Sequence, residues 1–225
     1  MNLSAILAIS FFPLALCVLC LALSHSLSVG RSMAGVLYGL AAVLAASIVQ
    51  AALSPLSVSL FAVIPALSLA LDAFFRIAFI EECAKFFAVA LVLRTAFRGI
   101  AREERTALES ALLVALSFAA FENVFYGIRV PASLTARSLF SLPVHASLTM
   151  IASLALSRGF RGGRYLLIAS SLHAAFNLLM GAGYPLVFAG FLLVPVLALA
   201  ALSLWLKSAH GDEPRGDSRF GGGHS

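Results

Sequence analysis

The chain has 225 residues, of which 61% are hydrophobic and only 11% are charged, and its mean hydropathy is +1.02. Soluble domains carry about 25% charged residues, so this composition excludes a soluble globular protein and predicts an all-α, polytopic transmembrane helix bundle in a lipid bilayer. The net charge of +5 comes mainly from dispersed arginines, without clustered basic and aromatic residues, so no nucleic-acid partner is expected.

A helix that crosses the hydrocarbon core needs about 20 apolar residues. Seven runs come close to this length, and they cover residues 3–23, 33–53, 72–94, 106–128, 138–157, 165–180 and 185–206. An eighth apolar run, 54–71, is short and contains Pro55 and Pro65, and the sequence leaves open whether it crosses. The N-terminus lacks a basic segment, so the first run is expected to be retained and not cleaved as a signal peptide. Residues 1–206 are therefore predicted to form one transmembrane domain.

The arginines predict the orientation of the bundle. Residues 94–105 carry four arginines and residues 158–164 carry three. Both segments should be cytoplasmic by the positive-inside rule, and two spans separate them, so the two assignments agree. The C-terminus, two spans later, is then cytoplasmic as well. From Lys207 the chain is polar and rich in glycine, so residues 207–225 are expected to form a disordered cytoplasmic tail.

The stretch 79–87 places two carboxylates and an ammonium group inside an apolar run. Each such group at the centre of a bilayer costs about 2.5–3.5 kcal/mol, so Glu81, Glu82 and Lys85 need partners, water or both. Glu81 and Lys85 are four residues apart and would pair on one face of a helix. That pairing leaves Glu82 about 100° around the helix without a partner. The stretch is therefore a candidate functional site.

Three later spans also carry polar side chains. They are Glu122, Asn123 and Tyr126 in 106–128, His145 in 138–157, and His173 and Asn177 in 165–180. Glu122 and Tyr126 are four residues apart, as are His173 and Asn177, so each pair should share a helix face. At about 1.5 Å per residue, the acids and imidazoles lie roughly 9–14 Å from the outer ends of their spans. This common depth predicts one water-filled chamber. Gln50 is the only strongly polar residue of the first two spans, which are expected to serve in packing.

These groups match the needs of peptide hydrolysis in a membrane, which requires a water, a base, oxyanion donors and an acid for the leaving amine. Neighbouring carboxylates cannot easily both ionise, so one of the glutamates is poised to act as a general base while Lys85 holds the other as an anion. His173 and Asn177 are plausible oxyanion donors, and His145 would hold the water or protonate the amine. No serine has the Gly-x-Ser-x-Gly setting of an activated nucleophile.

Four motifs in order resemble the PrsW family of intramembrane proteases, which is distantly similar to the CAAX prenyl proteases and the bacteriocin-processing proteases. The motifs are Glu81-Glu82-x-x-Lys85, Phe118-Ala119-x-x-Glu122-Asn123-x-x-Tyr126, His145 and His173-x-x-x-Asn177. The resemblance covers residues 70–180 and implies an integral protein of the bacterial cytoplasmic membrane. It also implies a water activated by Glu81 or Glu82, histidines and an amide around the oxyanion, and a membrane-tethered protein substrate such as an anti-sigma factor.

Two positions depart from the family pattern. Ser153 stands where a glycine is expected, and Asn177 stands where the last motif can end in Asp. The signature His-Glu-x-x-His of zinc proteases is absent, so no cofactor is expected, with zinc as the alternative because Glu and His are good zinc ligands. Two other hypotheses remain. The polar residues could form the proton relay of a transporter, or a non-catalytic chamber that binds a helix or a lipid.

Overall fold

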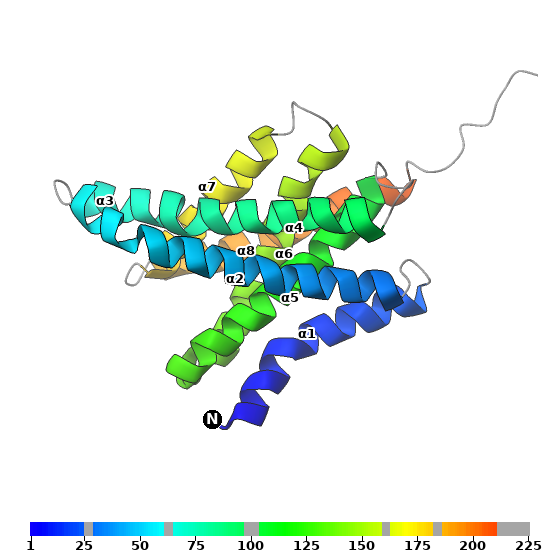
Figure 1. The fold of residues 1–225 in the computed structure, drawn as a ribbon, viewed down its shortest axis with the longest axis horizontal. Helices are drawn as coiled ribbons and strands as arrows, with labels where there is room; N and C mark the ends of the chain where they lie inside the picture. Colours follow the sequence, from blue (N-terminus) through cyan, green and yellow to red (C-terminus); the bar gives the residue numbers. More distant parts are fainter. Residues whose placement is uncertain (25–28, 61–64, 97–103, 159–162, 182–185, 211–225) are drawn as a thin grey trace, which may run out of the picture.

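The computed structural model of the chain describes residues 1–24, 29–60, 65–96, 104–158, 163–181 and 186–210, and the regular structure within them is all helical (Figure 1). In order, the helices are α1 (Leu3–Leu23), α2 (Val29–Leu60), α3 (Pro65–Leu71), η1 (Asp72–Phe79), α4 (Ile80–Ala96), α5 (Glu104–Arg129), η2 (Pro131–Ser133), α6 (Leu134–Arg158), α7 (Gly163–Gly181) and α8 (Leu186–His210). The predicted all-α class is confirmed.

Five of the described helices are long and apolar enough to cross a membrane. The apolar segments are Leu3–Leu23, Val29–Pro55, Glu104–Arg129, Pro131–Leu156 and Ala189–Ser208. The predicted spans 72–94 and 165–180 form η1 with α4, and α7, which are not among the five. Helix α4 carries four charged side chains, Glu81, Glu82, Lys85 and Arg94, and α7 has only 19 residues, among them Arg164, His173 and Asn177. The predicted number of seven crossings therefore stays a prediction.

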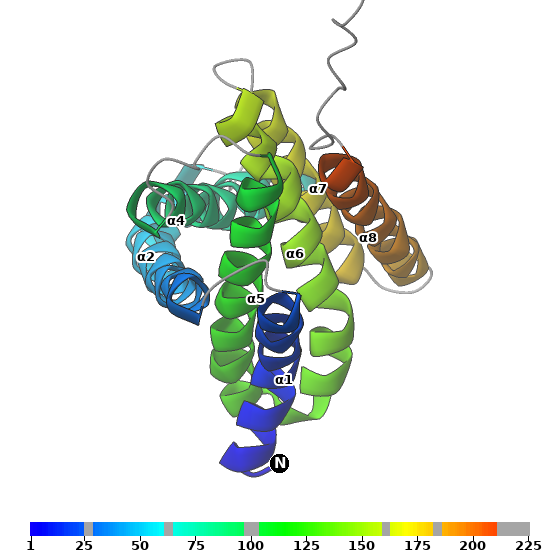
Figure 2. The same cartoon turned by 90° about the vertical axis from the view of Figure 1, so that its right-hand side faces the viewer.

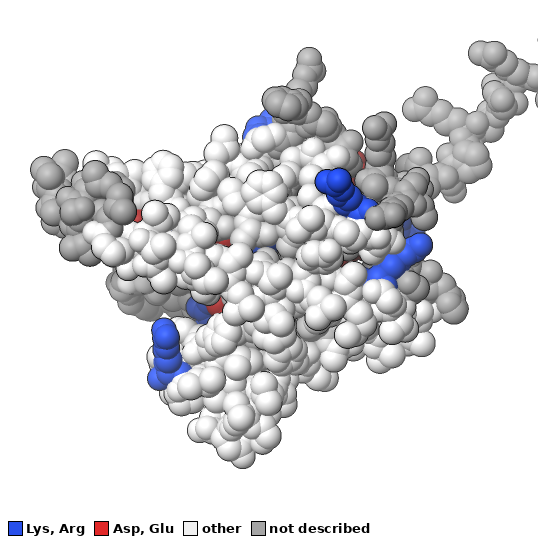
Figure 3. Space-filling view, in the orientation of Figure 1, with Lys and Arg blue, Asp and Glu red and all other residues white. Residues whose placement is uncertain are grey.

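Helices α5 and α6 form the centre of the bundle (Figure 2). In the most apolar stretch of each helix, 61% of the residues of α5 and 67% of those of α6 are buried, compared with 22% for α1, α2 and α8. The outer helices instead expose large apolar side chains, such as Phe12 and Ile48. On the face drawn in Figure 3, charged side chains of either sign appear at only a few places, and most of the described surface is uncharged. The outer helices thus present the apolar face that contact with lipid requires.

Glycines allow α2 to pack very closely on α5. A Cβ atom added to Gly39 would lie 2.5 Å from Ser117 Cβ, and one added to Gly35 would lie 2.9 Å from Leu113 Cβ. Gly35 and Gly39 are four residues apart, which is the small-xxx-small spacing of closely packed membrane helices. The close approach lets the Ser117 hydroxyl donate a hydrogen bond of 2.8 Å to the carbonyl of Val36.

Helix α3 and the π-helix η1 precede α4 in the chain. Helix α3 lies where α2 ends and η1 begins (Figure 1), and α2 then packs along α4. Pro55 lies inside α2, and Pro65 begins α3. Helix η1 is a π-helix that continues directly into α4. Such wide turns are frequent at functional sites, and this one ends at the residue before Ile80, immediately ahead of the glutamate pair.

Two predicted boundaries differ from the structure. Residues 129–137 were expected to form a connection, but Pro131 begins the short helix η2 and α6 starts at Leu134. Proline is well suited to a first helical turn, where a free N–H is not needed. Arg137 therefore lies on a helix. At the other end of the chain, α8 continues to His210, four residues into the predicted tail, and residues 211–225 lie outside the described part.

Candidate active site

Lys85 and Glu82 form a completely buried ion pair on α4. The Nζ atom of Lys85 donates to Oε1 of Glu82 at 2.5 Å, and both side chains are fully inaccessible. The alternative of a simple pair between Lys85 and Glu81 is therefore not what the structure contains, and the glutamate that Lys85 holds is Glu82. The three-residue spacing to Glu82 is equally compatible with a helix, and it lets Lys85 reach inward to the Phe118 ring, 4.9 Å from Nζ, and to His145.

His145 lies between a cation and a carboxylate. Its Nδ1 accepts a hydrogen bond from Lys85 Nζ at 3.1 Å, and its Nε2 lies 3.1 Å from Oε2 of Glu122. An ammonium group can only donate, so we assign the ring hydrogen to Nε2, facing the Glu122 carboxylate. Both ring nitrogens of His145 therefore face side chains, Lys85 on one side and Glu122 on the other.

His173, from α7, connects the two glutamates of α4. Its Nδ1 donates to Oε1 of Glu82 at 2.8 Å, and its Nε2 lies 3.7 Å from Oε2 of Glu81. The Glu82 contact fixes the hydrogen of a neutral ring on Nδ1, so Nε2 presents a lone pair towards Glu81. The rings of His173 and His145 meet edge to face, with centroids 5.0 Å apart. The structure thus brings together the two histidines that the sequence placed on different spans.

Glu81 differs from the other two carboxylates of this region. Its Oε1 accepts a hydrogen bond from the Gln50 amide at 3.0 Å, whereas Glu82 and Glu122 each pair with a cation. Its Oε2 is buried and makes no hydrogen bond within the described part of the chain, as is also the case for Oε2 of Glu82 and of Glu122. Of the three, Glu81 alone both lines the cavity and lacks a paired cation, because Glu82 lies behind the wall and Glu122 pairs with Arg137. A buried acceptor without a partner costs about 1–3 kcal/mol, so this oxygen is suited to hold a water, a proton or a cation.

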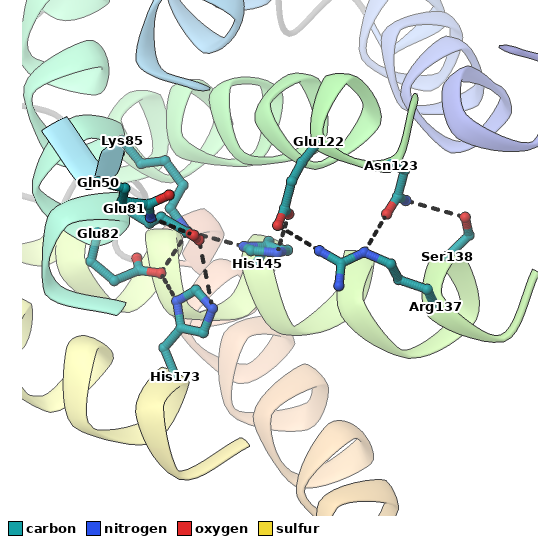
Figure 4. A network of polar contacts seen from close by, with 10 residues as sticks. All are labelled: Gln50, Glu81, Glu82, Lys85, Glu122, Asn123, Arg137, Ser138, His145 and His173. Atoms are coloured by element: carbon teal, nitrogen blue, oxygen red, sulfur yellow. Dashed lines mark hydrogen bonds and ion pairs between the residues drawn. The ribbon is translucent and has the colours of Figure 1, made fainter. Parts of the chain in front are cut away.

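Gln50 was missed as a site residue, because the first two spans were expected to serve only in packing. The signal was present, since Gln50 is a lone strongly polar residue near the end of an apolar helix. In Figure 4 its amide points from α2 to the Glu81 carboxylate. Helix α2 therefore contributes to the site as well as to packing.

Glu122 is held from the opposite side by Arg137, a residue just outside the predicted span 138–157. Nη2 of Arg137 donates to Oε1 of Glu122 at 2.5 Å, and Nε donates to Oδ1 of Asn123 at 3.1 Å (Figure 4). The amide of Asn123 donates in turn to Ser138 at 3.1 Å. Tyr126 does not bind Glu122; the Arg137 guanidinium lies over its ring, at 4.5 Å.

Arg137 belongs to a polar series on one side of η2 and α6, which follow each other directly in the chain. Ser133, Arg137, Ser141 and His145 are spaced by four residues and all line the same cavity. Four-residue spacing keeps side chains on neighbouring turns of a helix face. This spacing is the sequence signal that would have identified Arg137, had α6 been predicted to begin early enough to include it.

The cavity has a volume of about 590 Å³ and reaches the centre of the polar network. Of the predicted site residues, those that line it are Glu81, Glu122, Tyr126, His145, His173 and Asn177. The other three, Glu82, Lys85 and Asn123, lie behind this wall and hold its members in place. Two of the three predicted acids and both imidazoles thus line one cavity, Glu82 lies behind its wall, and the catalytic roles of these residues stay a prediction.

Ser117 and Ser170, two of the intramembrane serines, do not line the cavity and are engaged with backbone carbonyls. The hydroxyl of Ser117 donates to the carbonyl of Val36, and that of Ser170 donates to the carbonyl of Leu166 at 2.9 Å. Cys83 is a free, half-buried thiol that does not line the cavity. The arrangement favours direct attack by water over a covalent intermediate.

Comparison with known protein families identifies the chain. Residues 27–204 match the family profile described as PrsW family intramembrane metalloprotease. The chain belongs to this family. It is therefore an integral membrane protein and a peptide hydrolase, and the resemblance predicted from the four motifs is confirmed. No curated protein and no solved structure matches the chain.

The description of the PrsW family implies a metal ion, and three side chains of the site could bind one. Glu81, His145 and His173 each offer one ligand atom, and these atoms lie within 4.8 Å of one another. Two imidazoles and a carboxylate are a common set of zinc ligands. The free Oε2 of Glu81 and the lone pair of His173 fit this role directly. His145 fits it after giving up its contact with Lys85 or Glu122.

Proposed function

We propose that this PrsW protease hydrolyses a peptide bond of a membrane-tethered protein with a water activated by Glu81. The observation that carries the proposal is the free Oε2 of Glu81, which faces His173 at the wall of the cavity. Of the two candidate bases, Glu82 does not line the cavity, and its Oε1 already accepts hydrogen bonds from Lys85 and His173. Glu82 is therefore the anchor of the site, and Glu81 is the base.

Each remaining residue has a role that follows from its contacts. Gln50 holds the first oxygen of Glu81, so the second oxygen points at the water. Glu82 orients His173, whose Nε2 lone pair accepts a hydrogen bond from the same water. Because Nε2 lacks a hydrogen, the predicted oxyanion role of His173 passes to the amide of Asn177, which lines the cavity one helical turn away.

The proton balance of the reaction is simple. Glu81 takes a proton from the water as the oxygen adds to the peptide carbonyl carbon. When the C–N bond breaks, Glu81 returns this proton to the leaving nitrogen. His145 carries its hydrogen on Nε2, between Glu122 and the cavity, and stabilises the charge that develops during these steps.

A second candidate assigns Glu81, His145 and His173 to a zinc site, as their mutual distances and the family description favour. When bound there, zinc would lower the pKa of a bound water to about 7 and polarise the peptide carbonyl. Glu81 cannot be both ligand and base, so the two candidates assign it different roles. The engagement of both ring nitrogens of His145 favours the metal-free site that the sequence predicted.

The test of the proposed function uses purified protein and a single-span substrate in proteoliposomes. Glu81→Gln should lower cleavage by about 10²–10⁴-fold, the usual contribution of a general base, without changing the melting temperature. The matched control is Glu109→Gln, because Glu109 is equally buried but pairs with Arg105 away from the cavity. Full activity of Glu81→Gln would overturn the proposal.

Metal analysis separates the two candidates. The zinc site predicts about one zinc per chain in the wild type and its loss in Glu81→Gln and His173→Gln. The metal-free site predicts less than stoichiometric zinc and full cleavage after chelation. The zinc content is measured on the protein itself, so the result does not depend on activity.

The arrangement in the membrane and the substrate are part of the same proposal. We assign seven crossings, because η1 with α4 forms a continuous helical segment of 25 residues and α7 has 19, close to the length of a span. The C-terminus is assigned to the cytoplasm of a bacterial cell by the positive-inside rule. The resemblance favours a membrane-tethered regulator such as an anti-sigma factor as substrate.

A further inference from the structure

The cavity of the active site has an apolar part that the reaction does not use. Phe140 of α6, Phe176 and Met180 of α7, and Phe191 of α8 all line it. The rings of Phe140 and Phe191 lie against each other, with centroids 4.3 Å apart and an angle of 31°. Three helices thus bring aromatic and thioether side chains to the same hollow that holds the catalytic groups.

These side chains lie on one side of the histidines. Phe140 precedes His145 by five residues, and Met180 follows His173 by seven. Helices α6 and α7 are neighbours and run in opposite directions, so both displacements point the same way (Figure 2). At about 1.5 Å per residue they amount to about 7.5 and 10.5 Å along the helices.

An extended peptide covers this distance in a few residues. The rise of extended chain is about 3.3 Å per residue, so 7.5–10.5 Å corresponds to about two or three residues. A side chain that reached the apolar part would therefore belong to a residue two or three positions from the peptide bond being cleaved. The polar series on η2 and α6, from Ser133 to His145, lines the same cavity and can meet the peptide backbone.

We propose that Phe140, Phe176, Met180 and Phe191 form a subsite for a large apolar side chain of the substrate, two or three residues from the scissile bond. The inference rests on the proposed function, because it takes the scissile bond to lie beside Glu81. The occupant belongs to the substrate because the subsite shares one cavity with the reacting groups. Burial of its apolar surface against the aromatic walls is what stabilises the bound peptide.

The first test varies the substrate. In a single-span substrate with a mapped cleavage site, the residues two and three positions away on each side are changed one at a time to Ala, Leu or Phe. At one position, Leu and Phe should raise kcat/KM over Ala by about 10–100-fold, the discrimination typical of an apolar pocket. Equal kcat/KM values for Ala, Leu and Phe at all four positions would overturn the proposal.

The second test varies the subsite in two directions. Met180→Trp fills the space, so cleavage of the Phe substrate should fall to the level of the Ala substrate, which itself stays a substrate. Phe140→Ala opens the space and should reduce the preference for Leu over Ala by at least about fivefold. The control is Leu139→Ala, because Leu139 is 65% exposed on the outside of α6. A preference that neither variant alters would place the subsite elsewhere.

The two proposals fail in different ways. Loss of side-chain preference with continued dependence on Glu81 removes the subsite and keeps the assigned base. Cleavage that no longer depends on Glu81 but keeps its preference removes the base and keeps the subsite. Activity on the Ala substrate also reports folding, so a variant that merely unfolds is recognised by loss of both activities.

Discussion

Helix α5 takes part in two regions of opposite character. Against α2 it forms a dry contact, where Gly39 and Ser117 bring the helices so close that an added methyl group would not fit. Five residues further along, Glu122 enters a polar network beside a cavity. Lipid is as apolar as the side chains, so close packing has to supply the rigidity of the bundle. The dry contact therefore stabilises the fold. This stability allows the polar network to keep Glu81 without a paired cation.

The largest loss of stability and activity is expected when the polar network loses its buried cation, Lys85. Lys85→Met leaves Glu82 buried without its cation, which should lower the free energy of unfolding by about 3–5 kcal/mol and abolish cleavage. Unfolding in mild detergent and a cleavage assay measure the two losses. The double variant Lys85→Met, Glu82→Gln should recover most of the stability but none of the activity. Recovered cleavage would contradict the role of Glu82 as an anchor.

The next effect lies in the dry contact. Gly39→Val should lower the free energy of unfolding by about 1–3 kcal/mol, because its side chain meets Ser117 and the carbonyl of Val114. Protein that remains folded at low temperature should cleave with an unchanged KM. Gly30→Val is the matched control on α2, since no atom lies within 4 Å of a Cβ added there. Equal stability of the two variants would contradict the comparison.

Gln50 links the two regions, because it lies on the packing helix α2 and donates a hydrogen bond to Glu81 in the site. Gln50→Met removes the donor to Glu81 and keeps the volume, so kcat should fall while KM and the melting temperature stay the same. A hydrogen bond to a charged group contributes about 1.5–3 kcal/mol, which corresponds to about a 10–150-fold loss. Gln50→Glu lacks the donor and adds a like charge, so its loss should be at least as large. A change confined to KM would mean that Gln50 binds substrate.

The smallest effect is expected at Ser117. Ser117→Ala removes the hydrogen bond to Val36 and leaves the close packing in place, so stability should fall by about 0.5–1.5 kcal/mol. Cleavage should be unchanged, because Ser117 contacts α2 and not the cavity. Any loss of kcat beyond the loss of folded protein would show that the two regions are coupled.

The sequence predicted the helical class and the gathering of the motif residues, for a clear physical reason. Acids and imidazoles are expensive in lipid, so their presence in several spans indicates a shared polar interior. Seven of the nine predicted site residues lie in the network of Figure 4, and Asn177 and Tyr126 line the adjoining cavity.

Partner choice and helix boundaries were less predictable. Lys85 can reach either glutamate from its position on α4, and only the approach of α6 and α7 makes Glu82 the better partner. Arg137 was not predicted as a site residue, because the segment that contains Pro131 was expected to connect two spans and instead begins a helix. The role of Gln50 depends on the packing of α2 along α4, and a single sequence does not show which helices are neighbours.

The contacts in Figure 4 run without interruption from Gln50 to Glu81, His173, Glu82, Lys85, His145, Glu122, Arg137, Asn123 and Ser138. Side chains that share partners have coupling energies of about 0.5–3 kcal/mol, so their substitutions do not add. Epistasis should therefore be strong along this line. A single exchange at either end would be tolerated poorly, and relatives that differ here are expected to differ at two or more adjoining positions together.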